Sequence, residues 1–375
     1  MKILYLMHVD WNWIKQRPHF IAEKLVENGI EVEVYYQKYF NKKLLTTNAK
    51  GNFIIKGIPR LPMSRFSVIK KINTFIYECI LAHLLSTGIY DYVYLTHPIL
   101  FSKKINVSII YDCMDDVLEF SSDLNKKKEL FVLERQLVQH SNYVFFTSEH
   151  LKNTVLKRYS LDSIYGKFFV NNNAIELPKT HIVESVKLSE SNRIKFVYVG
   201  TITEWFDFNL LKSLDKKKYE FHLFGPVYNI STNGQENVMF HGSVSREKIF
   251  SLMNAADILI MPFRVNNLIE SVNPVKLYEY IFSCKPIISV KYGEALKFSD
   301  YVYLYENGNA KSFEDCVEKI EANEMKCKAG ETKCKIFAEN NTWNSRALEI
   351  KRQISEADAY KKLPECLDEN CGEKL

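Results

Sequence analysis

The segment from residue 261 to residue 290 restricts the fold of this chain more than any other stretch of its sequence. An apolar run at 257–261 precedes a polar loop, a helical pattern follows the loop, and a second apolar run at 286–290 ends the segment. Short apolar runs bounded by turn residues are typical of buried strands. Asn273 is a good N-cap, and Pro274 fits the first helical position, where a missing N–H has no cost. The order strand, helix, strand predicts a helix packed on a sheet.

The start of this helix is suited to an anionic ligand. Free backbone N–H groups and the positive end of the helix dipole face the loop there. Lys276 and Glu279 are three residues apart, so they share a helix face near that end. The lysine could reach a diphosphate, and the carboxylate could accept hydrogen bonds from two sugar hydroxyls. A weakly coupled ion pair on a solvated face is the alternative explanation of the same spacing.

This stretch resembles the donor-nucleotide motif of glycosyltransferases with the GT-B fold, specifically the family 4-like enzymes that build bacterial surface polysaccharides. The resemblance implies that Glu279 binds the ribose and that Lys276 lies near the phosphates. Such enzymes usually carry a second glutamate eight residues earlier, where this chain has Ser271. Glu270 is offset from that position by one residue.

Length and composition fit two ordinary globular domains. The chain has 375 residues, of which 46% are hydrophobic and 25% charged. Residues 1–180 carry 24 Lys and Arg against 17 Asp and Glu, and the remaining residues carry 26 against 28. A basic first half could attract anionic lipid headgroups or a pyrophosphate-linked acceptor. A basic surface also attracts nucleic acid, but the sequence contains no base-reading motif, so we expect no nucleic-acid partner.

Targeting signals are not apparent. The apolar run at 3–7 is too short for a signal peptide, and no stretch approaches the roughly 20 apolar residues of a membrane span. We therefore expect a cytoplasmic protein with reduced cysteines, which touches the inner face of the membrane peripherally at most. The helical pattern at 65–85 is basic and aromatic, as on a membrane-touching surface, but an ordinary core-facing helix is the favoured interpretation. The spacing of the eight cysteines is not that of a zinc site.

The first fifty residues predict a parallel strand–helix–strand unit. An apolar run at 2–7 is followed by a Trp-rich loop, a helix opened by Pro18, and a second strand at 30–36. Ligands in such sheets bind where strands end. The loop lacks the G-x-G-x-x-G pattern, which argues against a dinucleotide dehydrogenase. The motif at 16–19 resembles the opening of teichuronic-acid-type glycosyltransferases. The predicted acceptor-binding residues are His8, Trp11, Trp13, Arg17 and His97. Sugar stacking and domain-interface packing remain equal alternatives for the two tryptophans.

An acidic cluster follows the strand predicted at 107–111. Asp112, Asp115 and Asp116 would repel one another, which raises at least one pKa and suits proton transfer. A metal site of the Asp-x-Asp type is disfavoured because the spacing of Asp112 and Asp115 does not match it. The GT-B resemblance implies an acidic or histidine residue near the reacting carbon. Asp115 and Asp116 are the candidates, both are expected to face the cleft, and the choice between them is open.

The second half repeats the alternation of strands and helices. Gly200 follows a strand at 194–199 and would let a phosphate or a sugar approach the backbone closely. In the relatives, the turns that carry Gly225 and Val244 hold the nucleotide base. The predicted donor site consists of Gly200, Thr201, Gly225, Val244, Arg264, Glu270, Ser271, Asn273, Lys276 and Glu279. Asn173 stands where relatives have glycine in a sharp turn, so a left-handed conformation is expected there.

The predicted fold class is α/β, with two Rossmann-like domains facing a cleft. Residues 1–178 would bind the acceptor and residues 190–345 the nucleotide sugar, with a linker at 178–192 and a helix from about 355 to 375 crossing back to the first domain. The resemblance implies transfer of a sugar from a nucleotide sugar to a hydroxyl of a surface glycan or a polyprenyl-pyrophosphate-linked acceptor. It further implies retention of configuration, no metal and no cofactor besides the nucleotide sugar. A nucleotide-sugar 2-epimerase and a non-catalytic subunit of a transferase complex stay open as alternatives.

Overall fold

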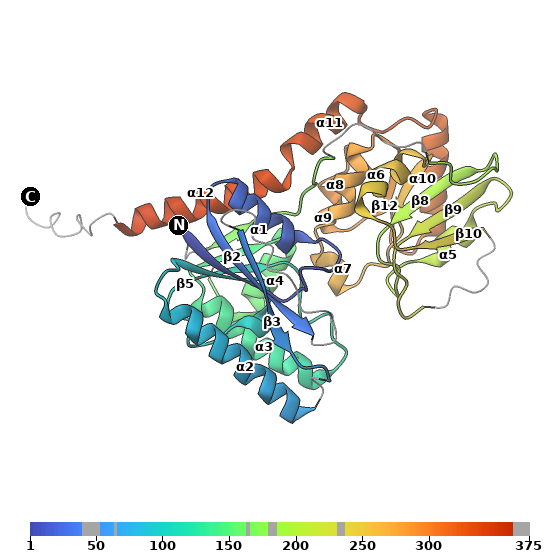
Figure 1. Ribbon diagram of the computed structural model, residues 1–375. Coiled ribbons are helices and arrows are strands. Elements are labelled where there is room, and N and C mark those ends of the chain that lie inside the picture. Colours follow the sequence, from blue (N-terminus) through green and yellow to red (C-terminus); the bar gives the residue numbers. More distant parts are fainter. Residues whose placement is uncertain (40–52, 64–65, 163–165, 179–185, 231–236, 363–375) are drawn as a thin grey trace, which may run out of the picture.

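Two α/β lobes make up the computed structural model (Figure 1). The model describes the chain except residues 40–52, 64–65, 163–165, 179–185, 231–236 and 363–375. Residues 179–185 of the predicted linker therefore lie outside the described residues, as does the end of the predicted crossing helix. No helix among the described residues combines the length and apolar content that a membrane crossing requires.

The first lobe contains a parallel sheet and helices on both of its faces. Its strands are β1 (Lys2–Met7), β2 (Glu31–Tyr39), β3 (Phe53–Arg60), β4 (Tyr92–Leu95), β5 (Ser108–Cys113), β6 (Tyr143–Phe146) and β7 (Phe168–Val170). Its helices are α1 (Arg17–Glu27), α2 (Ser67–Ser86), the 3-10 turn η1 (Pro98–Leu100), α3 (Leu124–His140) and α4 (Glu149–Tyr159). The strand order is β3-β2-β1-β4-β5-β6-β7, and all neighbours run parallel.

Alternation along β1 explains why helices cover both faces of this sheet. Successive side chains of a strand point to opposite faces. Leu4 and Leu6 belong to the apolar cluster that contains the buried residues of α2, α3 and α4. Ile3 and Tyr5 belong to a second cluster, which contains the buried residues of α1. The strand is buried on both sides, as parallel strands usually are.

The second lobe repeats this architecture with fewer strands. Its strands are β8 (Ile194–Val199), β9 (Tyr219–Phe224), β10 (Val238–Gly242), β11 (Ile258–Met261), β12 (Ile287–Val290) and β13 (Tyr303–Tyr305). Its helices are α5 (Phe208–Ser213), α6 (Arg246–Asn254), α7 (Asn267–Ser271), α8 (Val275–Phe282), α9 (Gly293–Leu296), α10 (Ala310–Ala322) and α11 (Glu331–Asn340). The parallel strand order is β10-β9-β8-β11-β12-β13. The two Rossmann-like sheets confirm the predicted α/β class.

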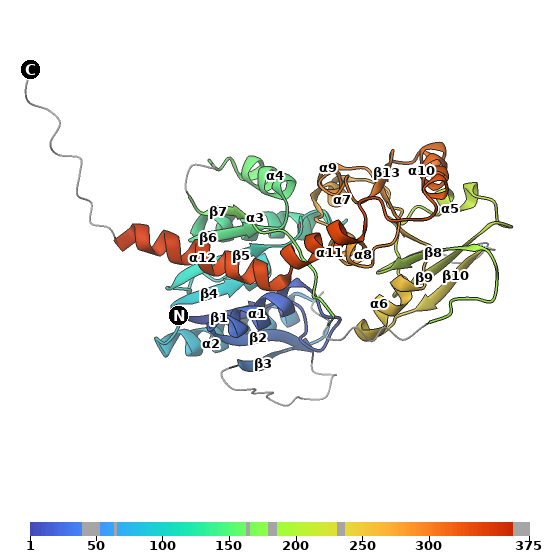
Figure 2. The same cartoon turned by 90° about the horizontal axis from the view of Figure 1, so that it is seen from above.

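The helix α12 (Trp343–Lys362) leaves the second lobe and lies along α1 of the first lobe (Figures 1 and 2). The Trp343 ring stacks on the Phe20 ring with centroids 5.1 Å apart. Trp343 and Ile354 are both fully buried in the apolar cluster of that face. The predicted crossing helix is therefore confirmed, but it begins at residue 343 rather than near 355. Thr342 caps it, with Oγ1 accepting from the Ser345 N–H at 3.2 Å.

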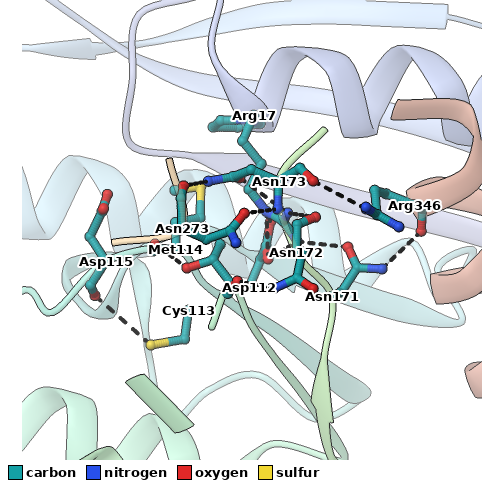
Figure 3. Close-up of polar contacts among 12 residues, drawn as sticks. Arg17, Asp112, Cys113, Met114, Asp115, Asn171, Asn172, Asn173, Asn273 and Arg346 are labelled. Carbon is teal, nitrogen blue, oxygen red and sulfur yellow. Dashed lines mark hydrogen bonds and ion pairs between the residues drawn. The ribbon is translucent and has the colours of Figure 1, made fainter. Parts of the chain in front are cut away.

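Residues 171–173 follow β7 and form the junction between the lobes (Figure 3). Arg17 holds this junction from α1. Its Nη2 donates to Asp112 Oδ1 and to Asn171 Oδ1, both at 2.9 Å. Its Nη1 donates to the Asn172 carbonyl at 3.1 Å. Arg17 and Asp112 are both buried, and the Arg17 guanidinium makes its hydrogen bonds to residues of the junction. The predicted role of Arg17 in acceptor binding is therefore corrected to a structural role.

Asn173 connects the junction to the second lobe (Figure 3). Its N–H donates to Asn273 Oδ1 at 2.8 Å, and its side-chain amide donates to the Asn273 carbonyl at 2.7 Å. Arg346 of α12 donates to the Asn173 carbonyl at 3.2 Å. The residues with positive φ do not include Asn173, so the predicted left-handed conformation is wrong. The prediction of Asn273 as N-cap is also wrong, because α8 begins one residue later with Pro274 in the cap position.

Candidate active site

A cavity of about 380 Å³ opens in the first lobe where β1, β4 and β5 end. This is the edge at which parallel sheets bind ligands. The lining residues are His8, Arg60, Thr96, His97, Ile99, Tyr111, Met114, Asp115, Val117, Phe120, Ser121, Lys126 and Leu130. Three residues selected from the sequence, His8, His97 and Asp115, are thus brought together. We call this space the first-lobe cavity.

The two histidines of the cavity present different hydrogen-bonding groups. Their ring centroids lie 4.8 Å apart. His8 Nδ1 lies 2.9 Å from Thr96 Oγ1, and when that hydroxyl donates to the Leu6 carbonyl at 3.3 Å, the imidazole Nδ1–H donates to the hydroxyl oxygen. His97 Nδ1 accepts from the Ile99 N–H at 3.1 Å, which places its proton on Nε2. In that tautomer of His8, the neutral pair offers an acceptor nitrogen on His8 and a donor N–H on His97.

Burial keeps both imidazoles uncharged at neutral pH. Burial first, and repulsion from the neighbouring His19 second, together lower the pKa of His8 to about 4. Burial lowers the pKa of His97 to about 3, with added repulsion from His8, Lys126 and Arg60. Neutral imidazoles that accept and donate are suited to holding the hydroxyls of a sugar.

Asp115 is the acidic group of this cavity. The pKa of its carboxyl group is raised to about 6, because burial and the Asp112 and Asp116 carboxylates raise it more than Arg17 lowers it. The side chain remains partly accessible from the cavity. A carboxyl group whose pKa lies near neutral pH can both accept and return a proton. Asp115 is therefore the residue of the acidic cluster that is placed for proton transfer.

Asp116 does not share this position. It is buried, and its carboxylate pairs with Arg158 of α4. Its Oδ1 also accepts from the Leu118 N–H at 3.3 Å. The same Arg158 donates to the buried Glu134 at 3.1 Å. The prediction that both aspartates face the cleft is wrong for Asp116, because Asp116 pairs with the partly buried Arg158 and Asp115 does not.

The Trp-rich loop lies beside this region, and its two tryptophans differ. Trp11 packs edge-on against Phe53 of β3, with ring centroids 5.6 Å apart, and lies 5.0 Å from the His19 ring. It is therefore packed within the first lobe rather than at a domain interface. Trp13 is 47% exposed, and its side chain is the one on which a sugar could stack.

In the second lobe, Lys276 and Gly200 form a close pair at the end of β8. The Lys276 amine lies 5.5 Å from the centre of the Tyr198 ring and 5.8 Å from that of Phe263. A Cβ on Gly200 would lie 2.0 Å from Lys276 Cε and 2.7 Å from its Nζ. The missing side chain of Gly200 thus admits the lysine, whereas the sequence suggested that it admits the ligand. Burial lowers the pKa of Lys276, and Glu279 raises it.

Glu279 lies on the same helix and is held by an arginine of α6. Arg246 Nη2 donates to Glu279 Oε1 at 2.9 Å. The guanidinium carbon of Arg246 also lies 4.9 Å from the centre of the Phe20 ring in the first lobe. A carboxylate fixed in this way keeps its orientation toward a ligand.

The remaining residues of the predicted donor site divide between backbone and side-chain roles. Gly225 packs on Gly200, because a Cβ there would lie 2.0 Å from the Gly200 carbonyl oxygen. The Thr201 carbonyl accepts from the Tyr198 hydroxyl at 2.8 Å. Val244 is partly exposed in the turn before α6.

Four others are held by neighbouring groups. Arg264 is half-exposed and pairs with Asp207 at 3.2 Å. Glu270 accepts from the Gly293 N–H at 3.4 Å. Ser271 is buried, and its carbonyl accepts from Ser148 of the first lobe at 2.8 Å. Asn273 belongs to the junction described above. Ser271 and Asn273 are thus contacts between lobes rather than open ligand-binding groups.

Three cationic residues near these sites were not selected from the sequence. Arg60 is the last residue of β3, so the strand-end rule could have found it. Lys126 and Arg246 lie in the first turns of α3 and α6, where basic residues are neither required nor unusual. No group of three or more His, Cys, Asp or Glu within the described ranges is arranged to hold a metal ion.

Comparisons with known proteins agree with this geometry. Residues 181–341, which contain the Lys276 and Glu279 site, match the family model described as glycosyl transferases group 1. The chain is similar in structure to a sucrose-phosphate synthase from Thermosynechococcus elongatus, with a TM-score of 0.72 at 13% identity, covering 96% of this chain and 100% of that one. The chain has the GT-B fold.

Further GT-B structures and one curated relative are also similar. Anabaena HepE in complex with UDP and glucose gives a TM-score of 0.68 at 14% identity, covering 95% of this chain and all of that one. WaaG, a glycosyltransferase involved in lipopolysaccharide biosynthesis, gives 0.62 at 13% identity over 93% and 98% of the two chains. The putative teichuronic acid biosynthesis glycosyltransferase TuaH of Bacillus subtilis (strain 168) is 25% identical over 240 residues. That alignment spans 58% of this chain and 59% of the relative's length.

The different surroundings of the two aspartates predict opposite effects on stability. Because the pKa of Asp115 is raised from 3.8 to about 6, its contribution to folding is present below pH 4 and is lost as the pH rises through 6. Asp115→Asn should therefore gain melting temperature relative to the unmodified protein at pH 8 and not at pH 4. Asp116→Asn should lose roughly 2 kcal/mol at pH 8, because Arg158 keeps only one buried partner.

Thermal melts of the three proteins at both pH values measure this difference. A melting temperature of Asp115→Asn that falls at pH 8 as far as that of Asp116→Asn contradicts the assignment of Asp115 as the open carboxyl group.

Proposed function

We propose that this protein is a glycosyltransferase that moves a sugar from a nucleotide sugar, with UDP sugars as the first donors to test, to a hydroxyl of a surface glycan or a lipid-linked acceptor. The observation that carries the proposal is the pair on α8. Lys276 lies at the end of β8, and Glu279 follows it by three residues on α8, within the segment that matches the glycosyl transferase family. The choice of UDP is supported by HepE, whose structure was solved with UDP and with UDP-glucose.

Each lobe has a distinct part in the proposed reaction. Glu279 accepts the ribose hydroxyls, with Arg246 holding its carboxylate. Lys276 and the backbone N–H groups at the start of α8 stabilise the negative charge that develops on the leaving diphosphate. In the first-lobe cavity, His8 and His97 orient the acceptor, and Asp115 takes the proton of its attacking hydroxyl. Retention of configuration rests on the family resemblance.

Removing the Glu279 carboxylate tests the donor site. Glu279→Ala leaves two ribose hydroxyls without their acceptor and should weaken UDP binding by about 1–3 kcal/mol, roughly 5- to 150-fold. Calorimetric titration with UDP measures the loss. Glu247→Ala is the matched control, because that glutamate lies exposed in the first turn of α6, next to Arg246. Equal UDP affinity of folded Glu279→Ala and the unmodified protein would falsify the ribose assignment.

Turnover of UDP-glucose followed by NMR separates the enzyme classes. A transferase releases UDP together with free or transferred glucose, at a rate that Asp115→Asn lowers by about 10²-fold. A 2-epimerase converts the donor into its epimer without any acceptor. A non-catalytic subunit binds UDP and leaves every donor unchanged, and the one-residue offset of Glu270 is the feature that favours this alternative.

Metal independence has its own test. Lys276 and the start of α8 supply positive charge at the position where a metal-dependent transferase would use a divalent ion. We therefore expect UDP release from the donor to continue at an unchanged rate in excess EDTA. A rate that falls in EDTA and recovers with Mg²⁺ or Mn²⁺ speaks for a metal-dependent reaction instead.

A peripheral membrane contact is supported by α2. Its second half buries Tyr77, Leu81 and Leu84, but its first half exposes Val68, Ile72 and Phe75, so the expected core-facing helix is only half correct. Lys70 and Lys71 lie between the exposed apolar residues. Apolar side chains flanked by lysines are suited to an anionic lipid surface.

Vesicle flotation tests this surface. Phosphatidylglycerol vesicles should carry the protein upward and phosphatidylcholine vesicles should not. Phe75→Ser should reduce the bound fraction severalfold, whereas Ile336→Ser, at an exposed apolar residue of α11 in the second lobe, should not change it. Equal losses in both variants contradict a role for α2.

A further inference from the structure

Three cysteines of the second lobe lie together near the end of α8 and the start of α11. Cys284 follows α8, Cys327 lies between α10 and α11, and Cys334 lies in α11. Cys334 is buried in the apolar core of the lobe, and Cys284 and Cys327 pack against that core and are partly exposed. The Cys334 thiol hydrogen-bonds with the thiols of both other residues. We call these three residues the thiol cluster, and Cys334 lies at its centre.

Cys284 has an unusual backbone conformation. It is the first residue after the C-cap of α8, and its φ is +54°. Glycine usually takes this left-handed position, because it has no Cβ to strain. The Sγ atom of Cys284 lies 3.8 Å from the carbonyl oxygen of Glu331, the first residue of α11. The thiol thus lies against α11, on a strained backbone of the kind that is common at functional sites.

The hydrogen bond between two of these thiols favours the thiolate of Cys284. It lowers the pKa of Cys284, and Lys335 adds to this, whereas burial and Glu331 oppose it. The same hydrogen bond is the largest of the effects that raise the pKa of Cys334, so Cys334 keeps its proton and donates it. The thiolate is the form of cysteine that reacts with oxidants. Cys284 is therefore the reactive thiol, and Cys334 is its immediate neighbour.

Metal binding is the other chemistry that three thiols could support. No group of three or more His, Cys, Asp or Glu in the part of the chain that the structure describes is arranged to hold an ion. Oxidation is the chemistry that fits the cluster better. An accessible thiol that ionises readily and has a second thiol beside it is the usual arrangement of a redox-sensing cysteine.

We propose that Cys284 and Cys334 form a disulfide when the protein meets hydrogen peroxide. The Cys284 thiolate attacks one peroxide oxygen, the O–O bond breaks, and the departing hydroxide takes up a proton and leaves as water. The Cys334 sulfur then loses its proton and attacks the sulfenic acid of Cys284, so the S–S bond forms and a second water leaves. Two thiols are oxidised, and one hydrogen peroxide is reduced to two waters. The bond joins α11 to the end of α8, the helix that carries Lys276 and Glu279.

Peptide mapping of the full chain after treatment with hydrogen peroxide tests the proposal. Cleavage after glutamate places the three cysteines on separate peptides, at 280–294, 325–331 and 332–339. We expect the first and the last of these peptides to be joined by a disulfide and to separate again in dithiothreitol. Any other pairing within the thiol cluster, or no pairing within it, overturns the proposal.

Serine variants assign the two roles. In Cys334→Ser the sulfenic acid of Cys284 should persist, and dimedone should label it about tenfold more than in the unmodified protein. Cys284→Ser should abolish the disulfide of Cys334. Cys327→Ser is the matched control, because it removes the third thiol of the cluster and should leave the disulfide intact. Thermal melts check that each variant is folded. Equal dimedone labelling of folded Cys334→Ser and the unmodified protein contradicts the role of Cys334.

Cys79, an exposed thiol of α2 in the first lobe, is an internal standard for reactivity. Cys284 should be oxidised about tenfold faster than Cys79, because the hydrogen bond from Cys334 favours its thiolate. Alkylation of the remaining thiols at short times after peroxide addition measures both rates in one sample. Oxidation of Cys79 as fast as that of Cys284 overturns the assignment of Cys284 as the reactive thiol. These measurements need neither a donor nor an acceptor, so their outcome is independent of the transferase proposal.

Discussion

The buried pair of Arg17 and Asp112 is the interaction on which the arrangement of the lobes depends. Burial alone lowers the pKa of Arg17, and the Asp112 carboxylate more than offsets this, so the guanidinium stays charged inside the protein. Leaving one partner of such a pair alone costs roughly 3–5 kcal/mol. The same guanidinium holds residues 171–173, and Asn173 in turn holds Asn273, one residue before the cap of α8. The position of α8 therefore depends on an ion pair of the other lobe.

The same pair also determines which acid is left for chemistry. Three aspartates lie within five residues, but Asp112 is neutralised by Arg17 and Asp116 by Arg158. Asp115 has neither partner and lies at the cavity beside two neutral imidazoles. One acidic segment thus supplies two structural contacts and one titrating group, because its residues point to different neighbours.

Prediction from the sequence succeeded where the signal was local. The strand β8 was delimited correctly, and β11 to within one residue, because apolar runs are visible within a few residues. Prediction failed for side chains whose partners lie far away in the sequence. Asp116 pairs with Arg158, which is 42 residues away, and Asn173 donates a hydrogen bond to Asn273, which is 100 residues away. Composition and spacing carry no information on such pairs, so the direction of these side chains became known only from the fold.

The crossing helix α12 has a consequence for how the chain is synthesised. Trp343 and Ile354 belong to the same apolar cluster as the buried face of α1. The first lobe is therefore synthesised first, but its apolar core is complete only after α12 has been synthesised. Until those residues emerge, Phe20 has no stacking partner, and more than three hundred residues separate it from that partner. Contacts of such long range form slowly. The strands and helices of the second lobe lie between residues 194 and 340, so this lobe can form its own core before α12 docks. Docking of α12 on α1 then completes the first lobe.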